Sequence, residues 1–200
     1  MASGFLLSIV EAELDRPSIR ARARRRGDAP PAWPKAPAPD RLLPTDREAR
    51  MATYTADVRW ALAAGEDFSA GRYSRGHTVR FDGGVELAGS ASPHVVGKWA
   101  VAAAVDPEEM LVAALSTCHM LSFVHVARLA GFVAQAYRDH AEGSMEEIAP
   151  GRQAVTRVVL HPRIEWTGAA PDAERLAALH HEAHETCFIA NSVRTEVTVA

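Results

Sequence analysis

Residues 106 to about 132 constrain this chain more than any other stretch, because they predict one long helix that is apolar around almost its whole circumference. Asp106 can cap this helix, Pro107 suits its first position, and Glu109 lies three residues after the cap in capping-box spacing. A helix that lacks a polar face is unsuited to a solvated surface. We therefore expect it at the centre of the fold, with the other elements packed around it.

Strand and helix signals alternate along the rest of the chain. Alternating apolar and polar residues predict half-buried strands in four regions, at 52–64, 72–91, 154–168 and 192–199. The second region turns as a hairpin at 82–84, and Pro162 places the third at a sheet edge or a bulge. We expect a second helix at 170–187 and loops at 92–105 and 143–150. Strands at both ends with two helices between them predict an α+β sandwich.

The first 50 residues differ in composition from the remainder. They hold seven of the twelve prolines and the run RARARRR, and their ten Lys+Arg against seven Asp+Glu give a net charge of +3. Residues 51–200 hold twelve against eighteen, a net charge of −6. We interpret residues 1–50 as a Pro- and Arg-rich, partly disordered extension, with a nucleic-acid contact or a targeting peptide as the alternative. Residues 51–200 are then one folded domain.

The composition as a whole is typical of a soluble globular protein. The chain has 200 residues, 48% of them hydrophobic, and a net charge of −3, which gives no reason to expect nucleic acid or a membrane as a partner. No apolar run approaches the roughly 20 residues that cross a bilayer, and we expect no signal peptide. We therefore expect a cytoplasmic protein, in which a disulfide between its two cysteines would be transient and redox-active.

Cys118 lies in the predicted central helix, where it is either a small core residue or a reactive thiol. A reactive cysteine attacks as the thiolate, which a neighbouring positive charge stabilises. The helix dipole cannot supply that charge, because Cys118 lies about three turns inside the helix. Glu108 could orient a cation, yet at about 1.5 Å per residue it lies roughly 15 Å from Cys118 along an unbroken helix. Activation therefore requires an arginine that reaches between the two residues, or a helix interrupted before Cys118.

Cys187 ends the second predicted helix and begins the sequence CFIANSV. About seventy residues before it lies DPEEMLVAALSTCHM, in which Pro-Glu stands ten residues before Cys118. Together the two motifs resemble the signature of the OsmC/Ohr family, the osmotically inducible and organic-hydroperoxide-resistance proteins. The resemblance covers about residues 52–199. It is greatest to an OsmC-like branch, because the Gly-rich arginine segment of the best-known hydroperoxide-resistance proteins is absent.

The resemblance implies an OsmC-like α+β fold. In this fold two chains intertwine as a homodimer, antiparallel sheets wrap two central helices, and the active sites form at the subunit interface. It also implies a cysteine-based peroxidase without a metal or an organic cofactor, in which the Cys118 thiolate attacks a peroxide and becomes a sulfenic acid. Cys187 then forms a disulfide with Cys118, and an external dithiol reduces it. The apolar helix around Cys118 favours organic hydroperoxides over hydrogen peroxide.

The resemblance also implies a glutamate and an arginine beside the reactive thiol. Glu108 falls on the glutamate position. We choose Arg75 for the arginine, and Arg72 and Arg80 in the same hairpin region are the alternatives. If none of the three arginines has this role, all three are solvated strand residues.

The histidines allow a different kind of site. His180, His184 and Cys187 have a spacing compatible with a metal on one helix face, but they lack the order of a zinc protease, and we interpret them as an exposed helix face. His119 and His125 are interpreted as core histidines. Two further functions remain open: a non-catalytic OsmC-like protein that binds a small apolar ligand, and a redox sensor whose disulfide signals to a partner.

Overall fold

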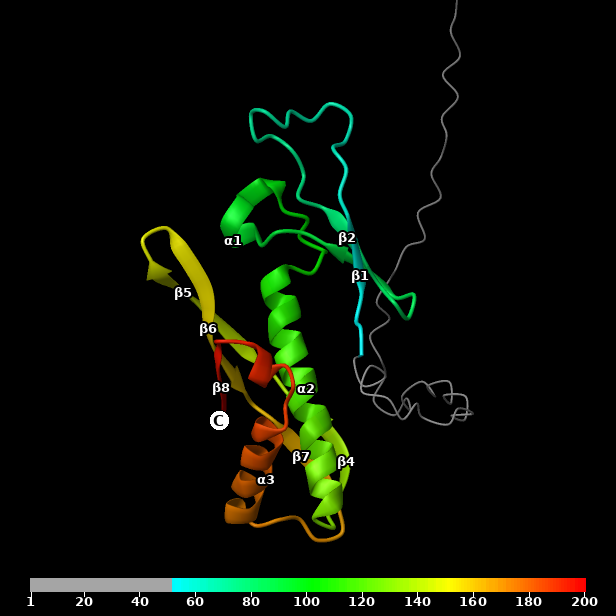
Figure 1. The fold of residues 1–200 in the computed structure, drawn as a ribbon, viewed down its shortest axis with the longest axis vertical. Helices are drawn as coiled ribbons and strands as arrows, with labels where there is room; N and C mark the ends of the chain where they lie inside the picture. The colour runs from blue at the N-terminus through cyan, green and yellow to red at the C-terminus, as the bar shows by residue number, and fades with distance from the viewer. Residues whose placement is uncertain (1–51) are drawn as a thin grey trace, which may run out of the picture. The chain divides into compact units, whose positions relative to one another are not determined.

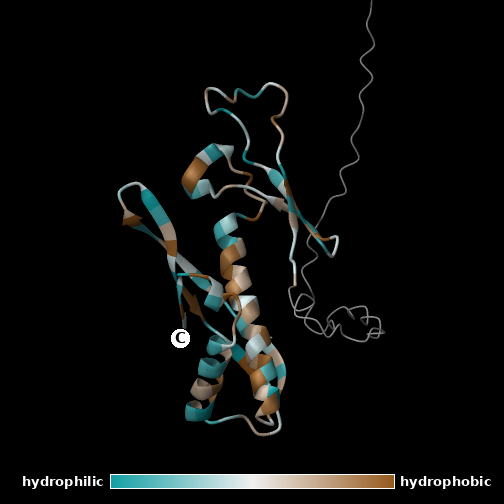
Figure 2. Cartoon of the chain, in the orientation of Figure 1, coloured by the Kyte–Doolittle hydropathy of each residue, from teal (hydrophilic) through white to brown (hydrophobic). Residues whose placement is uncertain are grey.

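In the computed structural model, which describes residues 52–200, the predicted long helix is α2, Pro107–Leu129 (Figure 1). Its N-terminus is capped as expected, because the Asp106 carboxylate accepts the backbone N–H of Glu109 and the Glu109 carboxylate accepts that of Asp106. The helix is unbroken, and apolar residues occur along most of its length (Figure 2). Our expectations for residues 1–50 lie outside the described residues.

Helix α2 takes part in two hydrophobic cores. In its C-terminal half it packs against α3, Ala173–Glu185, around the buried Phe123 and Leu179. In its N-terminal half, Leu115 packs against Val158 and Leu160. Burying each of these large side chains stabilises the fold by roughly 1.5–3 kcal/mol. The helix therefore lies centrally, as predicted, where its sides face these two cores.

The N-terminal sheet is an antiparallel meander that consists of β1, β2 and β3, at Ala56–Arg59, His77–Phe81 and Glu86–Gly89. The predicted hairpin turn joins β2 to β3, and Gly84 there has a φ of +82°, which a glycine adopts without strain. The prediction of a half-buried first strand is wrong, because all four residues of β1 are exposed. The predicted loop at 92–105 contains the short helices α1, Pro93–Val96, and η2, Gly97–Trp99.

Two further sheets pack against α2. One pairs β4, Val133–Arg138, with β7, Arg163–Thr167. The other has the order β5-β6-β8, with antiparallel β5 and β6 and a parallel pairing of β6 with β8, at Glu142–Ala149, Arg152–Leu160 and Glu196–Val199. The 3-10 helix η3, Ala190–Ser192, connects α3 to β8. Helices together with mainly antiparallel sheets confirm the predicted α+β class.

Two sequence predictions are wrong in this half of the chain. The segment 143–150, predicted as a loop, lies almost entirely in strand β5. The predicted strand at 154–168 is two strands in different sheets, because the chain leaves one ladder at Leu160 and enters another at Arg163. Pro162 lies at the break, where its missing N–H disturbs no ladder.

One face of α2 remains uncovered in the single chain. Leu121 is 62% exposed, Leu129 63% and Val124 40%. Within the described residues, α2 alone is long and apolar enough to cross a membrane by length and composition, and 28% of its most apolar window is buried. The core helix of a globular protein meets the same criteria. Contiguous apolar surface of this kind marks an interaction face.

Candidate active site

The fold brings the two cysteines together. Cys118 lies in the middle of α2, and Cys187 lies just after the end of α3. Both are free thiols, and they lie close enough for Cys118 to affect the pKa of Cys187. The turn after Cys187 secures the pair, because the N–H of Ile189 lies 3.5 Å from the Cys118 Sγ and the N–H of Ala190 lies 3.4 Å from the Cys187 Sγ. Two residues distant in sequence therefore form a dithiol between the helices.

The two thiols differ in environment. Cys187 is buried, whereas Cys118 is only partly buried. Burial, together with the hydrogen bond to Cys118, raises the pKa of the Cys187 thiol to about 11. Cys187 is therefore protonated at neutral pH. The more accessible sulfur belongs to Cys118.

A groove of about 570 Å³ opens beside Cys118 between α2 and the end of α3. Its walls are mainly apolar and come from the uncovered face of α2 and from the turn after Cys187. The residues that line it are Cys118, Leu121, Ser122, His125, Val126, Leu129, Glu182, Thr186 and Phe188. His125, predicted as a core histidine, is exposed in this groove. An apolar molecule can therefore reach the Cys118 sulfur.

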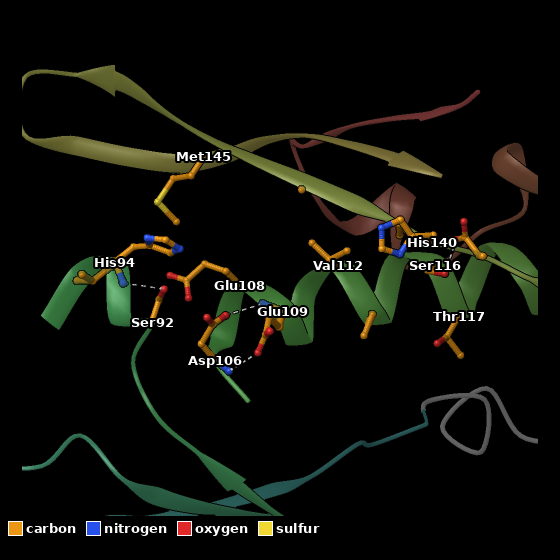
Figure 3. A pocket seen from close by; sticks show the side chains of 15 residues that line it. Ser92, His94, Asp106, Glu108, Glu109, Val112, Ser116, Thr117, His140 and Met145 are labelled. Carbon is orange, nitrogen blue, oxygen red and sulfur yellow. Dashed lines mark hydrogen bonds between the residues drawn. The ribbon is translucent and has the colours of Figure 1, made fainter. Parts of the chain in front are cut away.

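Glu108 lies in the first turn of α2 and is directed into a different pocket, of about 790 Å³, that contains neither cysteine (Figure 3). Its neighbours there include His94 from α1 and Met145 from β5. The Oε2 atom of Glu108 is buried and accepts no hydrogen bond from the residues that the structure describes. Since α2 is unbroken, Glu108 and Cys118 stay separated along the helix, and only a group that reaches between them can connect them.

Arg75 lies in a third pocket, of about 290 Å³, beside the aromatic side chains of Trp60, Phe68 and Tyr73. Its guanidinium lies 3.5 Å above the ring of Tyr73, and Nη1 donates to the Tyr73 carbonyl at 2.6 Å. Within residues 52–200, Arg75 forms no salt bridge with a carboxylate. The single chain therefore does not bring Arg75, Glu108 and Cys118 together.

The two alternative arginines have nearby carboxylates. Arg72 forms a salt bridge with Asp67 at 2.5 Å, on a surface where its side chain is 63% exposed. Arg80 is an exposed residue of β2, and its partners in register are Asp57 of β1 and Glu86 of β3. Cross-strand neighbours of opposite charge interact with each other. Arg75 is thus the candidate whose charge has no acidic neighbour in these contacts.

Sequence reasoning missed a histidine pair in which His119 is buried and His180 is half-buried. His119 Nε2 and His180 Nδ1 lie 3.0 Å apart, and the two rings stack at an interplanar angle of 11°. His119 is 1% exposed, as expected for a core histidine, and its Nδ1 has no partner among the described residues. Burial, with a smaller effect of His180 and His184, lowers the pKa of His119 to about 4. Burial also lowers the pKa of His180. The neutral pair connects α2 to α3.

The metal alternative gains no support from this arrangement. His180 directs Nδ1 to His119 and is not free on that side to ligate a metal together with His184 and Cys187. Between residues 52 and 200, no three His, Cys, Asp or Glu side chains form a group that could hold a metal ion. The sequence spacing that suggested the site therefore does not gather its residues in space.

Comparisons with known proteins agree on one family. The family model described as OsmC-like protein matches residues 100–200. The structure of an OsmC-like protein of unknown function from Vibrio cholerae O1 biovar eltor is 45% identical, with a TM-score of 0.72 over 75% of this chain and 99% of that one. No curated protein matches the chain.

More distant structures share the fold. An organic hydroperoxide resistance protein from Elizabethkingia anophelis is 21% identical, with a TM-score of 0.57 over 75% of this chain and 96% of that one. The organic hydroperoxide resistance protein OhrB of Bacillus subtilis is 17% identical, with a TM-score of 0.51 over 74% and 96%.

Proposed function

Because this chain belongs to the OsmC-like protein family, we propose that it is a cysteine-based peroxidase that reduces organic hydroperoxides. The observation that carries the proposal is the contact between a partly exposed Cys118 and a buried Cys187 beside an apolar groove. Two relatives that share the fold are named organic hydroperoxide resistance proteins. No metal or organic cofactor enters the reaction.

Cys118 performs the first step. Its thiolate attacks the distal oxygen of the hydroperoxide, the S–O bond forms as the O–O bond breaks, and the departing alkoxide takes a proton to become an alcohol. The sulfur, oxidised by two electrons, is now a sulfenic acid. Cys118 suits this role because it is the more accessible of the two thiols.

Cys187 performs the second step. Its sulfur, after loss of its proton, attacks the sulfenic sulfur of Cys118, so that the S–S bond forms and the oxygen departs as water. An external dithiol then supplies two electrons and two protons and restores both thiols. Before the sulfenic acid forms, the raised pKa of Cys187 keeps its thiol protonated, so Cys187 does not compete with Cys118 for the peroxide.

Two unmatched charges indicate how Cys118 is activated. Arg75 lacks an anionic partner, and the buried Glu108 oxygen lacks a donor, within the part of the chain that the structure describes. A buried carboxylate oxygen without a donor is costly, so a cation from outside the chain would stabilise it. The uncovered face of α2 requires a second apolar surface. A homodimer in which Arg75 of one copy contacts Glu108 and Cys118 of the other meets both needs.

We propose the remaining assignments on the basis of the resemblance to the family. Residues 51–200 are the OsmC-like domain, and residues 1–50 are an extension outside it. The protein acts in the cytoplasm, where dithiol reductants are plentiful. Its substrate is an organic hydroperoxide in preference to hydrogen peroxide, because the groove beside Cys118 offers apolar walls to an organic substituent.

Reaction of the reduced protein with cumene hydroperoxide and with hydrogen peroxide tests the proposal. We expect wild-type protein to lose two free thiols and to react faster with cumene hydroperoxide. A Cys187→Ser variant should accumulate a sulfenic acid that dimedone traps, and a Cys118→Ser variant should form none. Wild-type thiols that persist in excess organic peroxide would refute the peroxidase and favour a small-ligand-binding protein. Rapid oxidation without turnover by any dithiol would favour a redox sensor.

A further inference from the structure

We propose that His77 is a positioning residue, which fixes the backbone that presents Arg75. This inference rests on the proposed function, in which Arg75 contacts the reactive site. His77 begins β2, two residues after Arg75. Its Nδ1 lies 2.9 Å from the Arg75 carbonyl oxygen. A carbonyl oxygen only accepts, so Nδ1 carries the hydrogen and donates it. The bond therefore holds in both the neutral and the protonated imidazole.

His77 completes a set of bonds to the backbone around Arg75. The Arg75 N–H donates to the Trp99 carbonyl at 2.9 Å. The Ser74 N–H donates to the Glu66 carboxylate at 2.8 Å, and the Trp60 indole N–H donates to the Ser74 carbonyl at 3.0 Å. All four backbone polar groups of residues 74 and 75 are thus hydrogen-bonded, three of them to partners from other segments and the Arg75 carbonyl to His77. We call Trp60, Glu66, His77 and Trp99 the arginine frame.

The neighbouring strand of the sheet makes room for the His77 ring. Gly89 of β3 is its partner in register. A Cβ atom at residue 89 would lie 2.3 Å from His77 Nε2, closer than any non-bonded contact permits. The ring therefore occupies space that only a glycine leaves open. The absence of a Cβ at residue 89 allows the imidazole to lie against the Arg75 carbonyl, and the hydrogen bond holds it there.

The frame also orients the guanidinium. With the backbone fixed, the side chain of Arg75 lies on the Tyr73 ring, and its Nη1 donates one hydrogen bond to the Tyr73 carbonyl. A guanidinium has five N–H donors, so most of them remain for an anion. Preorganised donors stabilise a developing negative charge more effectively than mobile ones. His77 thus acts on the reaction through Arg75, without contact to the reacting atoms.

The test measures the rate constant for oxidation of Cys118 by cumene hydroperoxide in the full-length protein. We expect His77→Ala to lower it on the order of 10- to 100-fold, as for a catalytic group displaced by about 1 Å. His77→Asn should recover to within about threefold of wild type, because its amide N–H can replace Nδ1–H. Gly89→Ala should resemble His77→Ala, since it displaces the ring. His181→Ala, an exposed histidine of α3, is the matched control and should match wild type. Thermal unfolding identifies variants that do not fold.

A double variant separates positioning from a general structural role. If His77 acts through Arg75, then His77→Ala should have no further effect in an Arg75→Ala background. Additive losses, or an unchanged rate in folded His77→Ala, would overturn the role of His77 while the peroxidase stands. If folded Gly89→Ala and His77→Asn behave alike, both slow or both fast, the positioning role is also refuted. Wild-type protein that is inert toward peroxide would overturn the proposed function itself, and the role of His77 with it.

Discussion

Residues 52–105 and residues 106–200 are stabilised by different kinds of interaction. In the first region, Val79 is the one buried hydrophobic side chain among the described residues, and polar contacts fix the chain around Arg75. The second region contains both hydrophobic cores, and these hold the two cysteines in contact between α2 and α3. One region thus presents a cation and the other presents the thiols. Neither region contains the whole candidate site.

The largest expected effect comes from the thiol region. Cys118→Ser should abolish peroxide reduction, because an alcohol cannot replace the thiolate as nucleophile at neutral pH. Cys187→Ser should keep the first oxidation and lose steady-state turnover with a dithiol. Stopped-flow oxidation and steady-state peroxide consumption distinguish the two. Equal defects in both measurements would show that the cysteines do not have separate roles.

Removal of the cation tests the other region. Arg75→Ala should lower kcat/KM for cumene hydroperoxide by roughly 10²–10³-fold, the usual cost of removing one preorganised donor. Arg72→Ala and Arg80→Ala are matched controls and should stay near wild type, since these arginines have carboxylate neighbours. A large defect in either control, with none in Arg75→Ala, would transfer the role to that arginine.

The buried His119 predicts acid sensitivity of the thiol region. The pKa of His119 is about 4 in the folded protein against an ordinary value of 6.5, so between these values the unfolded chain binds a proton that the folded chain does not. Stability should therefore fall as the pH falls from 6.5 to 4, by roughly 3 kcal/mol. Urea unfolding across this range measures the slope. His119→Leu should flatten it and His181→Leu should not; an unchanged slope in His119→Leu would contradict the assignment.

Local signals predicted the thiol region well. The capping box, the apolar repeat of α2 and both cysteine motifs lie within short stretches of sequence, and each depends on neighbours a few residues apart. Strand β5 was missed because its residues are mostly exposed and carry no alternation of apolar and polar residues. The contact between His119 and His180 was missed because 61 residues separate them and no local pattern links them.

The arginine region was less predictable. Arg72, Arg75 and Arg80 look alike in sequence, and only the surrounding contacts distinguish them. The arginine frame draws on Trp60, Glu66 and Trp99, which come from separate segments of the chain. Helix geometry did predict the separation of Glu108 from Cys118, and the unbroken α2 is consistent with it.

Mixed dimers test most directly whether the site requires both regions from different copies. A heterodimer of Arg75→Ala with Cys118→Ser, purified through two affinity tags, should have about half the activity of the wild-type dimer, since one site regains both groups. A heterodimer of wild type with the double variant Arg75→Ala/Cys118→Ser should retain no more than the low activity of the Arg75→Ala protein. The reverse outcome, an inactive first heterodimer and a half-active second, would show that Arg75 and Cys118 of the same chain act together and would contradict the shared site.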